Sequence, residues 1–255
     1  MACRRATGPF TRTTLPLHAY LAHDRRQALA RDEPLPERCS GAALFADITG
    51  FTALTEALAQ GQGSRRGVDD LVRRINAVHE VLIGAVERAG GSVVSLAGDG
   101  MTCWFDDHHA SGEPAARRAL RCAGAMQQAM RPQPELSVKV GLAAGAAMRL
   151  AVGDPALQLL DLLAGATVAR AVAAESQALA GEVLVDGSIV APLSGPLAAP
   201  GTAHGLGAPR QTALGDPVYP YQVGADDDAT AASASSGAPV AAPSAAGSLP
   251  PAGRP

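Results

Sequence analysis

The chain has 255 residues, of which 47% are hydrophobic but only 3% aromatic, so it is long enough to bury a core built mainly from Ala, Val, Leu and Ile. Its formal net charge of −3 gives no electrostatic reason to expect nucleic acid or an anionic membrane as a partner. No stretch approaches the ~20 apolar residues of a membrane helix, and the four cysteines lack CxxC or metal-finger spacing, which favours a reduced, cytoplasmic protein.

Residues 1–38 are expected to form an N-terminal extension with one short helix. Apolar side chains recur at helical spacing from Leu15 to Ala30, and the proline-containing run at 31–36 ends that pattern. We expect this helix to dock on the domain that follows it, and contact with a partner is the alternative.

The first chemically informative stretch is Gly-Ala-Ala-Leu-Phe-Ala-Asp-Ile-Thr-Gly-Phe-Thr at 41–52. Residues 42–46 predict a buried strand, and Asp47 stands where that strand gives way to a glycine-containing turn. A helix is expected over residues 52–60. A longer helix should begin at Ser64 and end before Gly90, because apolar residues, including Val72, Val78, Leu82 and Val86, form one regular stripe along it.

The second informative stretch is Ser-Val-Val-Ser-Leu-Ala-Gly-Asp-Gly-Met-Thr-Cys-Trp-Phe at 92–105. Two strand-like runs, 93–96 and 101–105, are joined at Gly98-Asp99-Gly100, which predicts a β-hairpin. If this hairpin pairs with the strand before Asp47, both carboxylates project from one end of one sheet. Such a pair of carboxylates indicates a site for a divalent cation. The polar loop that follows, Asp106, Asp107, His108 and His109, is interpreted as a solvated turn rather than a second metal site.

The remainder of the chain alternates helices and strands. We expect a helix at 113–130, a strand at 136–145, a further strand or hairpin at 150–163, an alanine-rich helix at 165–179 and short strands at 182–186 and within 214–223. Residues 224–255, rich in Ala, Ser, Gly and Pro, are expected to be a disordered tail. The order of elements suits an α+β, ferredoxin-like sandwich over residues 39–223, with an antiparallel sheet and helices packed on one face.

The two aspartate motifs resemble the catalytic domain of class III nucleotidyl cyclases, which make cyclic AMP or cyclic GMP from the nucleoside triphosphate. The resemblance covers roughly residues 41–186 and rests on Phe-x-Asp-Ile-x-Gly-Phe-Thr, followed about fifty residues later by Gly-Asp in a hairpin. Within the family, the chain is most similar to the first catalytic half of the tandem, bicarbonate-responsive soluble type, through segments 46–56, 96–99 and 138–145. This resemblance implies the same sandwich fold, with ATP or GTP as the substrate.

The same resemblance assigns two divalent ions, Mg²⁺ or Mn²⁺, to the carboxylates of Asp47 and Asp99 and to the backbone carbonyl of Ile48. Hard oxygen ligands of this kind favour those two metals. The ions would serve the attacking ribose 3′-hydroxyl and the leaving pyrophosphate together. Backbone amides at the start of the following helix are expected to hold the β- and γ-phosphates. These amides belong to Thr49, Gly50, Phe51 and Thr52.

Other positions depart from the family pattern. Ser95 stands where members that read the purine have a lysine, and Leu162 stands at a further base-contacting position. Ala169 and Ala173 replace the asparagine that orients the ribose and the arginine that stabilises charge on the phosphates. Arg170 is the nearest arginine, but it is one residue out of place, which rotates it by about 100° around a helix.

In the tandem soluble type, one half carries the metal aspartates and the other carries the base-reading and charge-stabilising residues. We therefore interpret the chain as the metal-bearing half, which forms cyclic AMP only when dimerised with a complementary half. One alternative is a catalytically inactive module that binds a nucleotide and dimerises through the same face. The other is an active homodimer with two equivalent sites, in which Arg170 or Arg149 replaces the missing arginine. The lysine replaced by Ser95 also takes part in bicarbonate binding in those enzymes.

Overall fold

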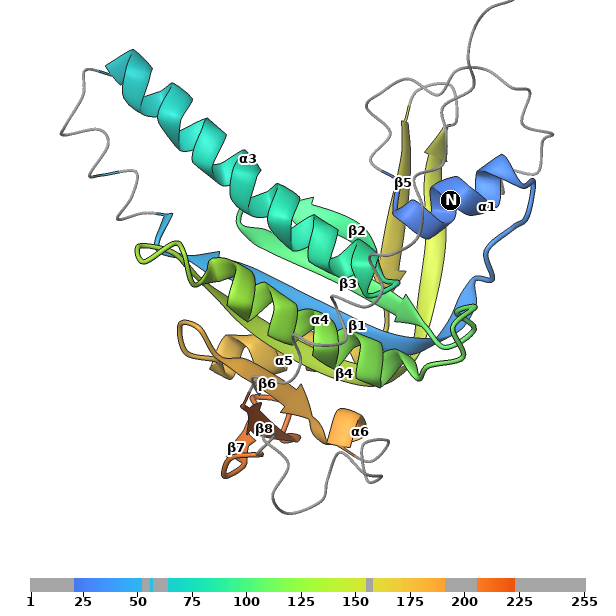
Figure 1. Ribbon diagram of the computed structural model, residues 1–255. Coiled ribbons are helices and arrows are strands. Elements are labelled where there is room, and N and C mark those ends of the chain that lie inside the picture. Colours follow the sequence, from blue (N-terminus) through green and yellow to red (C-terminus); the bar gives the residue numbers. More distant parts are fainter. Residues whose placement is uncertain (1–20, 52–55, 57–63, 155–157, 191–205, 223–255) are drawn as a thin grey trace, which may run out of the picture.

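A computed structural model describes residues 21–51, 56, 64–154, 158–190 and 206–222 (Figure 1). These residues form an eight-stranded sheet with the order β2-β3-β1-β4-β6-β8-β7, and β5 pairs with β4 outside this path. The strands are β1 (Arg38–Thr49), β2 (Ser92–Ala97), β3 (Gly100–Asp106), β4 (Ser137–Asp154), β5 (Gln158–Ala164), β6 (Val183–Asp186), β7 (Arg210–Gln211) and β8 (Pro217–Tyr221). The helices are α1 (His23–Ala30), α3 (Ser64–Arg88), α4 (Ala115–Met130), α5 (Ala166–Gln177) and α6 (Gly187–Val190). The predicted helix at 52–60, apart from Glu56, and the predicted tail at 224–255 lie outside the described residues.

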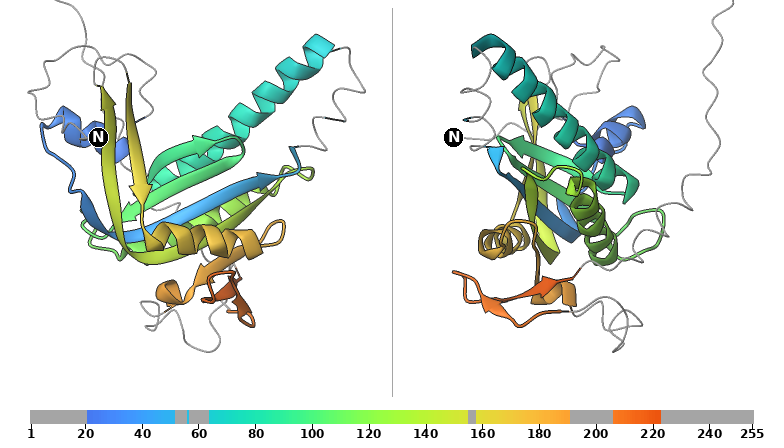
Figure 2. Two further views of the ribbon diagram at one scale, coloured as in Figure 1. Left: turned by 180° about the vertical axis from the view of Figure 1, so that it is seen from behind. Right: turned by 60° about the vertical axis from the view of Figure 1, so that its left-hand side comes forward.

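The α+β sandwich that the sequence predicts is confirmed, with one correction to its layers. Helices α3 and α4 cover one face of the sheet, whereas α5 packs on the opposite face (Figure 2). The reason is that β4 and β6 are parallel neighbours. A parallel pair needs a crossover connection, and α5 provides it. The other strand pairs within the described residues are antiparallel, as predicted.

Alternation along β1 decides which side chains face which layer. The even-numbered residues from Ala42 to Ile48 belong to the larger core under α3 and α4. Ala43 belongs to a smaller core that includes Ala171 of α5. Because successive side chains of a strand point to opposite faces, Asp47 lies on the α5 side of the sheet.

Only part of α3 contributes to the core. Val78, Leu82 and Val86 of the predicted stripe are buried, as expected. Val72, predicted on the same stripe, is 48% exposed, because the N-terminal end of α3 projects beyond the strands (Figure 1). The apolar stripe therefore predicts a longer buried segment of α3 than the structure shows.

Close contact between α5 and β4 depends on Gly141. A Cβ atom at this position would lie 2.1 Å from the carbonyl oxygen of Ala171 and 2.3 Å from the amide nitrogen of Glu175. Both are backbone atoms, so a side chain at 141 would push the helix away from the strand. Gly141 lies within the strand predicted at 136–145, and the structure shows that the backbone of α5 approaches it.

We expect Gly141→Ala to destabilise the fold by about 1–3 kcal/mol or more, because overpacking against backbone is costly. The matched control is Gly187→Ala, where an added Cβ meets nothing within 4 Å and little change is expected. Urea denaturation of both variants and the parent chain measures the difference. Equal stability of the two variants would contradict the close packing of α5.

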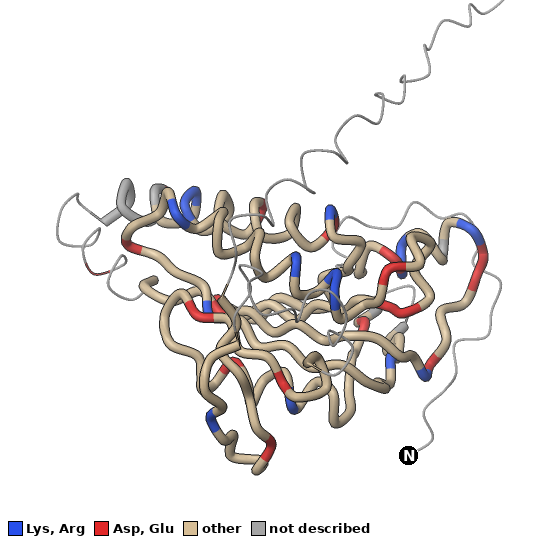
Figure 3. The backbone as a smooth tube through the Cα atoms, turned by 60° about the horizontal axis from the view of Figure 1, so that its bottom comes forward, with Lys and Arg blue, Asp and Glu red and all other residues tan. Residues whose placement is uncertain are grey.

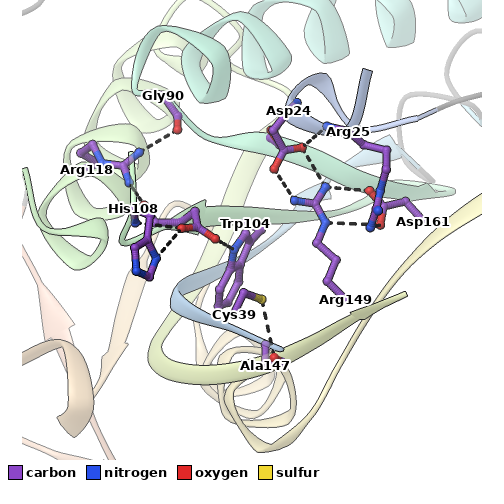
Figure 4. A network of polar contacts seen from close by, with 12 residues as sticks. Asp24, Arg25, Cys39, Gly90, Trp104, His108, Arg118, Ala147, Arg149 and Asp161 are labelled. Carbon is purple, nitrogen blue, oxygen red and sulfur yellow. Dashed lines mark hydrogen bonds and ion pairs between the residues drawn. The ribbon is translucent and has the colours of Figure 1, made fainter. Parts of the chain in front are cut away.

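Buried ion pairs attach α1 to the β4–β5 hairpin (Figure 4). Arg149 on β4 donates hydrogen bonds to Asp24 of α1 and to Asp161 of β5, the latter at 2.6 Å. Arg25 donates to the same Asp161 carboxylate at 3.0 Å, and the side chain of Asp161 is 0% exposed. Burial alone would raise the pKa of Asp24, but the hydrogen bonds and charge of Arg149 hold it below its usual value. The N-terminal helix therefore lies on its own domain.

Candidate functional site

Asp47 and Asp99 come together where β1 ends beside the β2–β3 turn. In the β1–β3 pairing, Asp47 lies opposite Gly100, the residue that follows Asp99. The backbone amide of Ile48 donates to the carbonyl oxygen of Asp99 at 3.1 Å. The structure thus brings the three predicted metal-binding residues to one end of the sheet. Their role as metal ligands stays a prediction.

Two glycines shape the loops that hold these aspartates. Gly98 has a φ of 65°, the left-handed region that favours glycine in a two-residue hairpin loop, and Asp99 is its neighbour in that loop. Gly50, after β1, has a φ of 103°, and a Cβ there would lie 2.3 Å from the carbonyl oxygen of Glu135. Glycine therefore allows the chain to turn sharply just before Asp99 and three residues after Asp47.

Lys139 is a further residue at this site, and the sequence analysis missed it. The β1–β4 register places Lys139 opposite Asp47, and its Nζ lies 3.3 Å from Asp47 Oδ2. The same Nζ lies 2.6 Å from Oε1 of Glu175 on α5. Burial alone would lower the pKa of Lys139, but Glu175 and Asp47 together raise it, so the amine is a cation. The one available signal was that Lys139 is the only lysine of the chain.

The predicted phosphate-binding residues, 49–52, follow Asp47 and Ile48 directly in the sequence. The Thr49 hydroxyl lies 2.6 Å from Oγ of Ser137, and Phe51 packs partly against the main core. Gly50 makes the turn between them, and Thr52 lies outside the described residues. Their role in holding phosphate groups stays a prediction.

The donors at this end of the sheet suit a hard divalent cation bound together with a nucleotide. The Asp47 side chain is 25% exposed, and Asp99 is exposed, so a cation in solution can reach both carboxylates. Within the described ranges, no group of three or more His, Cys, Asp or Glu side chains could hold a metal. Two carboxylates and a carbonyl leave the oxygen shell of Mg²⁺ or Mn²⁺ incomplete, and phosphate oxygens and water would complete it.

The acidic and histidine-containing loop at 106–109 has structural partners. Asp106 accepts a hydrogen bond from the backbone amide of His108 at 2.8 Å. Asp107 accepts from the Ser40 hydroxyl at 2.7 Å and from the amide of Ala115, at the start of α4, at 3.3 Å. These contacts agree with the interpretation of the loop as a turn.

The two arginines considered as replacements are both engaged elsewhere. Arg170 donates to the carbonyl oxygen of Ala144 at 2.8 Å and pairs with the buried Asp186 at 3.3 Å. Arg149 belongs to the buried network with Asp24 and Asp161, and its side chain is 3% exposed. In this arrangement Arg149 is a structural cation, and Arg170 is tied to the sheet rather than free to meet a phosphate.

The charges of the molecule are mixed. Acidic and basic residues are interspersed along the described backbone (Figure 3). None of the helices in the described ranges is long and apolar enough to cross a membrane.

The fold, with two aspartates at one end of its central strands, is that of a nucleotide cyclase catalytic domain. The chain belongs to the family described as the adenylate and guanylate cyclase catalytic domain, whose model matches residues 38–201. This membership confirms the resemblance drawn from the two aspartate motifs.

Sequence relatives include adenylate cyclase type 10 from Homo sapiens, 27% identical over 128 residues, which are 48% of this chain and 8% of the human protein. The same enzyme from Rattus norvegicus is 28% identical over 129 residues, or 47% of this chain and 8% of the rat protein. The matched region thus spans only a small part of these relatives.

Two solved structures show the same fold. The guanylate cyclase domain of RhGC from Catenaria anguillulae, in complex with GTP, has a TM-score of 0.58 at 19% identity, covering 73% of this chain and 97% of that chain. The adenylyl cyclase CyaB from P. aeruginosa has a TM-score of 0.57 at 21% identity, covering 72% and 93%. At such identities the likeness concerns the fold alone.

Proposed function

We propose that this chain is the metal-bearing half of an adenylate cyclase, which binds ATP with two divalent ions and forms cyclic AMP when paired with a complementary half. The observation that carries this proposal is the meeting of Asp47 and Asp99 at one sheet end, on a chain whose α5 has alanines at 169 and 173. ATP is preferred over GTP because the sequence relatives are named adenylate cyclases. We also propose the cytoplasm, where ATP is available, as the place of the reaction.

The chain's own residues divide the work of cyclisation. The carboxylates of Asp47 and Asp99, with the Ile48 carbonyl, would hold Mg²⁺ or Mn²⁺. When bound, these ions would stabilise the negative charge that develops on the attacking 3′-oxygen and on the leaving pyrophosphate. The amides of residues 49–52 would bind the β- and γ-phosphates. Lys139, whose Nζ lies 3.3 Å from Asp47 Oδ2, would add a cation to the same phosphate-binding site.

A second polypeptide is needed because this chain lacks residues that could orient the ribose and stabilise charge on the phosphates. The side chains at 169 and 173 are methyl groups, which can neither orient a ribose nor stabilise charge on a phosphate. Arg170 is already paired with Asp186, and Arg149 is buried with two acids. The base-reading and charge-stabilising groups would therefore come from a partner.

The β4–β5 hairpin offers a surface for that partner. Its outward face carries Met148 and Val152 of β4, 45% and 36% exposed, beside Leu160 and Leu162 of β5, 50% and 46% exposed. The opposite face of the hairpin is covered by α1 through the Arg149 network. A group of exposed apolar side chains on a projecting hairpin favours docking of another protein surface.

The test is cyclic AMP formation from ATP with Mn²⁺, for the chain alone and mixed with the second catalytic half of a tandem soluble cyclase. We expect background activity alone, clear activity in the mixture, and no activity when the mixture contains Asp47→Asn. GTP in parallel reactions tests the choice of base. ATP binding without turnover in any mixture would favour the inactive nucleotide-binding module, and full activity of the chain alone would favour the homodimer.

A further inference from the structure

Three charged side chains form a chain of ion pairs beside the candidate site: Asp47 of β1, Lys139 of β4 and Glu175 of α5. Lys139 lies between the two carboxylates, at 3.3 Å from Asp47 Oδ2 and 2.6 Å from Glu175 Oε1. Glu175 is 6% exposed, and apart from this ion pair its Oε1 has no hydrogen-bond partner within the part of the chain that is described. A carboxylate so deeply placed is tolerated only because a cation faces it.

The backbone fixes Glu175 in this position. Gly141 lets α5 lie directly on β4, with the amide of Glu175 at 2.3 Å from where a Cβ of residue 141 would stand. Lys139 precedes Gly141 by two residues on the same strand, so its side chain faces the same helix. The helix thus presents one acid to the only lysine of the chain.

A divalent cation and the Lys139 ammonium would compete for Asp47. Both are positive, and both would contact the Asp47 carboxylate, so a tightly held ammonium would weaken the metal site. Glu175 offers the ammonium a closer partner than Asp47 does, at 2.6 Å against 3.3 Å. The Asp47 carboxylate would then be available to bind a metal, while Glu175 neutralises the charge of Lys139.

We propose that Glu175 is a positioning residue, which holds Lys139 away from Asp47 when a divalent cation binds and keeps the ammonium beside the nucleotide phosphates. This role rests on the proposed metal and nucleotide site. Without Glu175, Asp47 is the only carboxylate that the described structure places next to Lys139, and the ammonium stays on the metal ligand.

The experiment measures Mn²⁺ affinity by calorimetry in the presence of a non-cyclising ATP analogue, using the full chain. Glu175→Gln keeps the shape of the side chain and removes its charge, and we expect roughly ten- to a hundredfold weaker Mn²⁺ binding, typical of lost support around a metal ligand. Adding Lys139→Met to Glu175→Gln removes the competing ammonium, and the Mn²⁺ affinity should rise again, but it should stay below the parent value because the cation beside the phosphates is also lost. Lys139→Met alone should change Mn²⁺ affinity much less than it does in the Glu175→Gln background.

The outcomes separate this inference from the proposed function. Absence of Mn²⁺ binding by the parent chain would remove the proposed function itself. Parent binding that Glu175→Gln leaves unchanged would overturn the positioning role. Equal effects of Lys139→Met in both backgrounds would also overturn it, because simple addition of charges predicts that equality. If Lys139→Met alone fails to fold, the comparison of Glu175→Gln with the double variant still tests the positioning role. A double variant that binds Mn²⁺ no more tightly than Glu175→Gln would contradict that role.

Discussion

Asp47→Asn is expected to lower Mn²⁺ affinity in the presence of an ATP analogue by about 100-fold or more, because a direct carboxylate ligand is worth several kcal/mol. The fold should survive, since Asp47 is partly exposed and Lys139 keeps Glu175 as a partner. Asp99→Asn should give a loss of similar size, because both carboxylates are proposed to bind the same ions. Calorimetric titration with Mn²⁺ measures each value.

The matched control is Asp69→Asn, which removes the same charge from an exposed position on α3. We expect its Mn²⁺ affinity to equal that of the parent chain. If all three variants bind Mn²⁺ like the parent, the two sheet-end aspartates hold no metal and the proposed cyclase chemistry is wrong. If only Asp47→Asn is impaired, the cation is held without Asp99.

Arg149→Met is expected to destabilise the chain by about 3–5 kcal/mol, because it removes the ionic partner of Asp24 and one of the two cations that face the buried Asp161 carboxylate. The side chain of Asp161 is 0% exposed, and Arg25 would be its one remaining ionic partner among the described residues. Removing Arg149 should also release α1 from the hairpin. Urea denaturation measures the loss, and hydrogen exchange of α1 locates it.

Arg74→Met is the control for that prediction, because Arg74 pairs with Glu135 at 3.1 Å on the surface, with side chains 51% and 63% exposed. An exposed pair of this kind contributes only about 0–1 kcal/mol. A similar small loss in both variants would mean that the Arg149 network does not hold α1. It would also revive the alternative in which Arg149 replaces the missing charge-stabilising arginine.

Several elements of the fold follow from local patterns. The hairpin at Gly98-Asp99 is confirmed because glycine chemistry fixes a two-residue loop from its own sequence. The buried strand before Asp47 is confirmed because an uninterrupted apolar run has few other solutions. The 150–163 segment proved to be a hairpin whose first strand continues β4, because nothing in the sequence between 145 and 150 breaks extended backbone.

The sequence by itself determined the family and predicted Asp47 and Asp99 as metal ligands, because their motifs are short runs of neighbouring residues. Only the tertiary structure decided that Lys139 stands between Asp47 and Glu175, since strand register and the side taken by a crossover helix depend on residues far apart in the chain. It likewise decided that Arg149 serves α1 rather than the site, because its partner Asp24 lies 125 residues away. Periodicity and turn chemistry are local properties, whereas pairing between distant charges appears only once the sheet has closed.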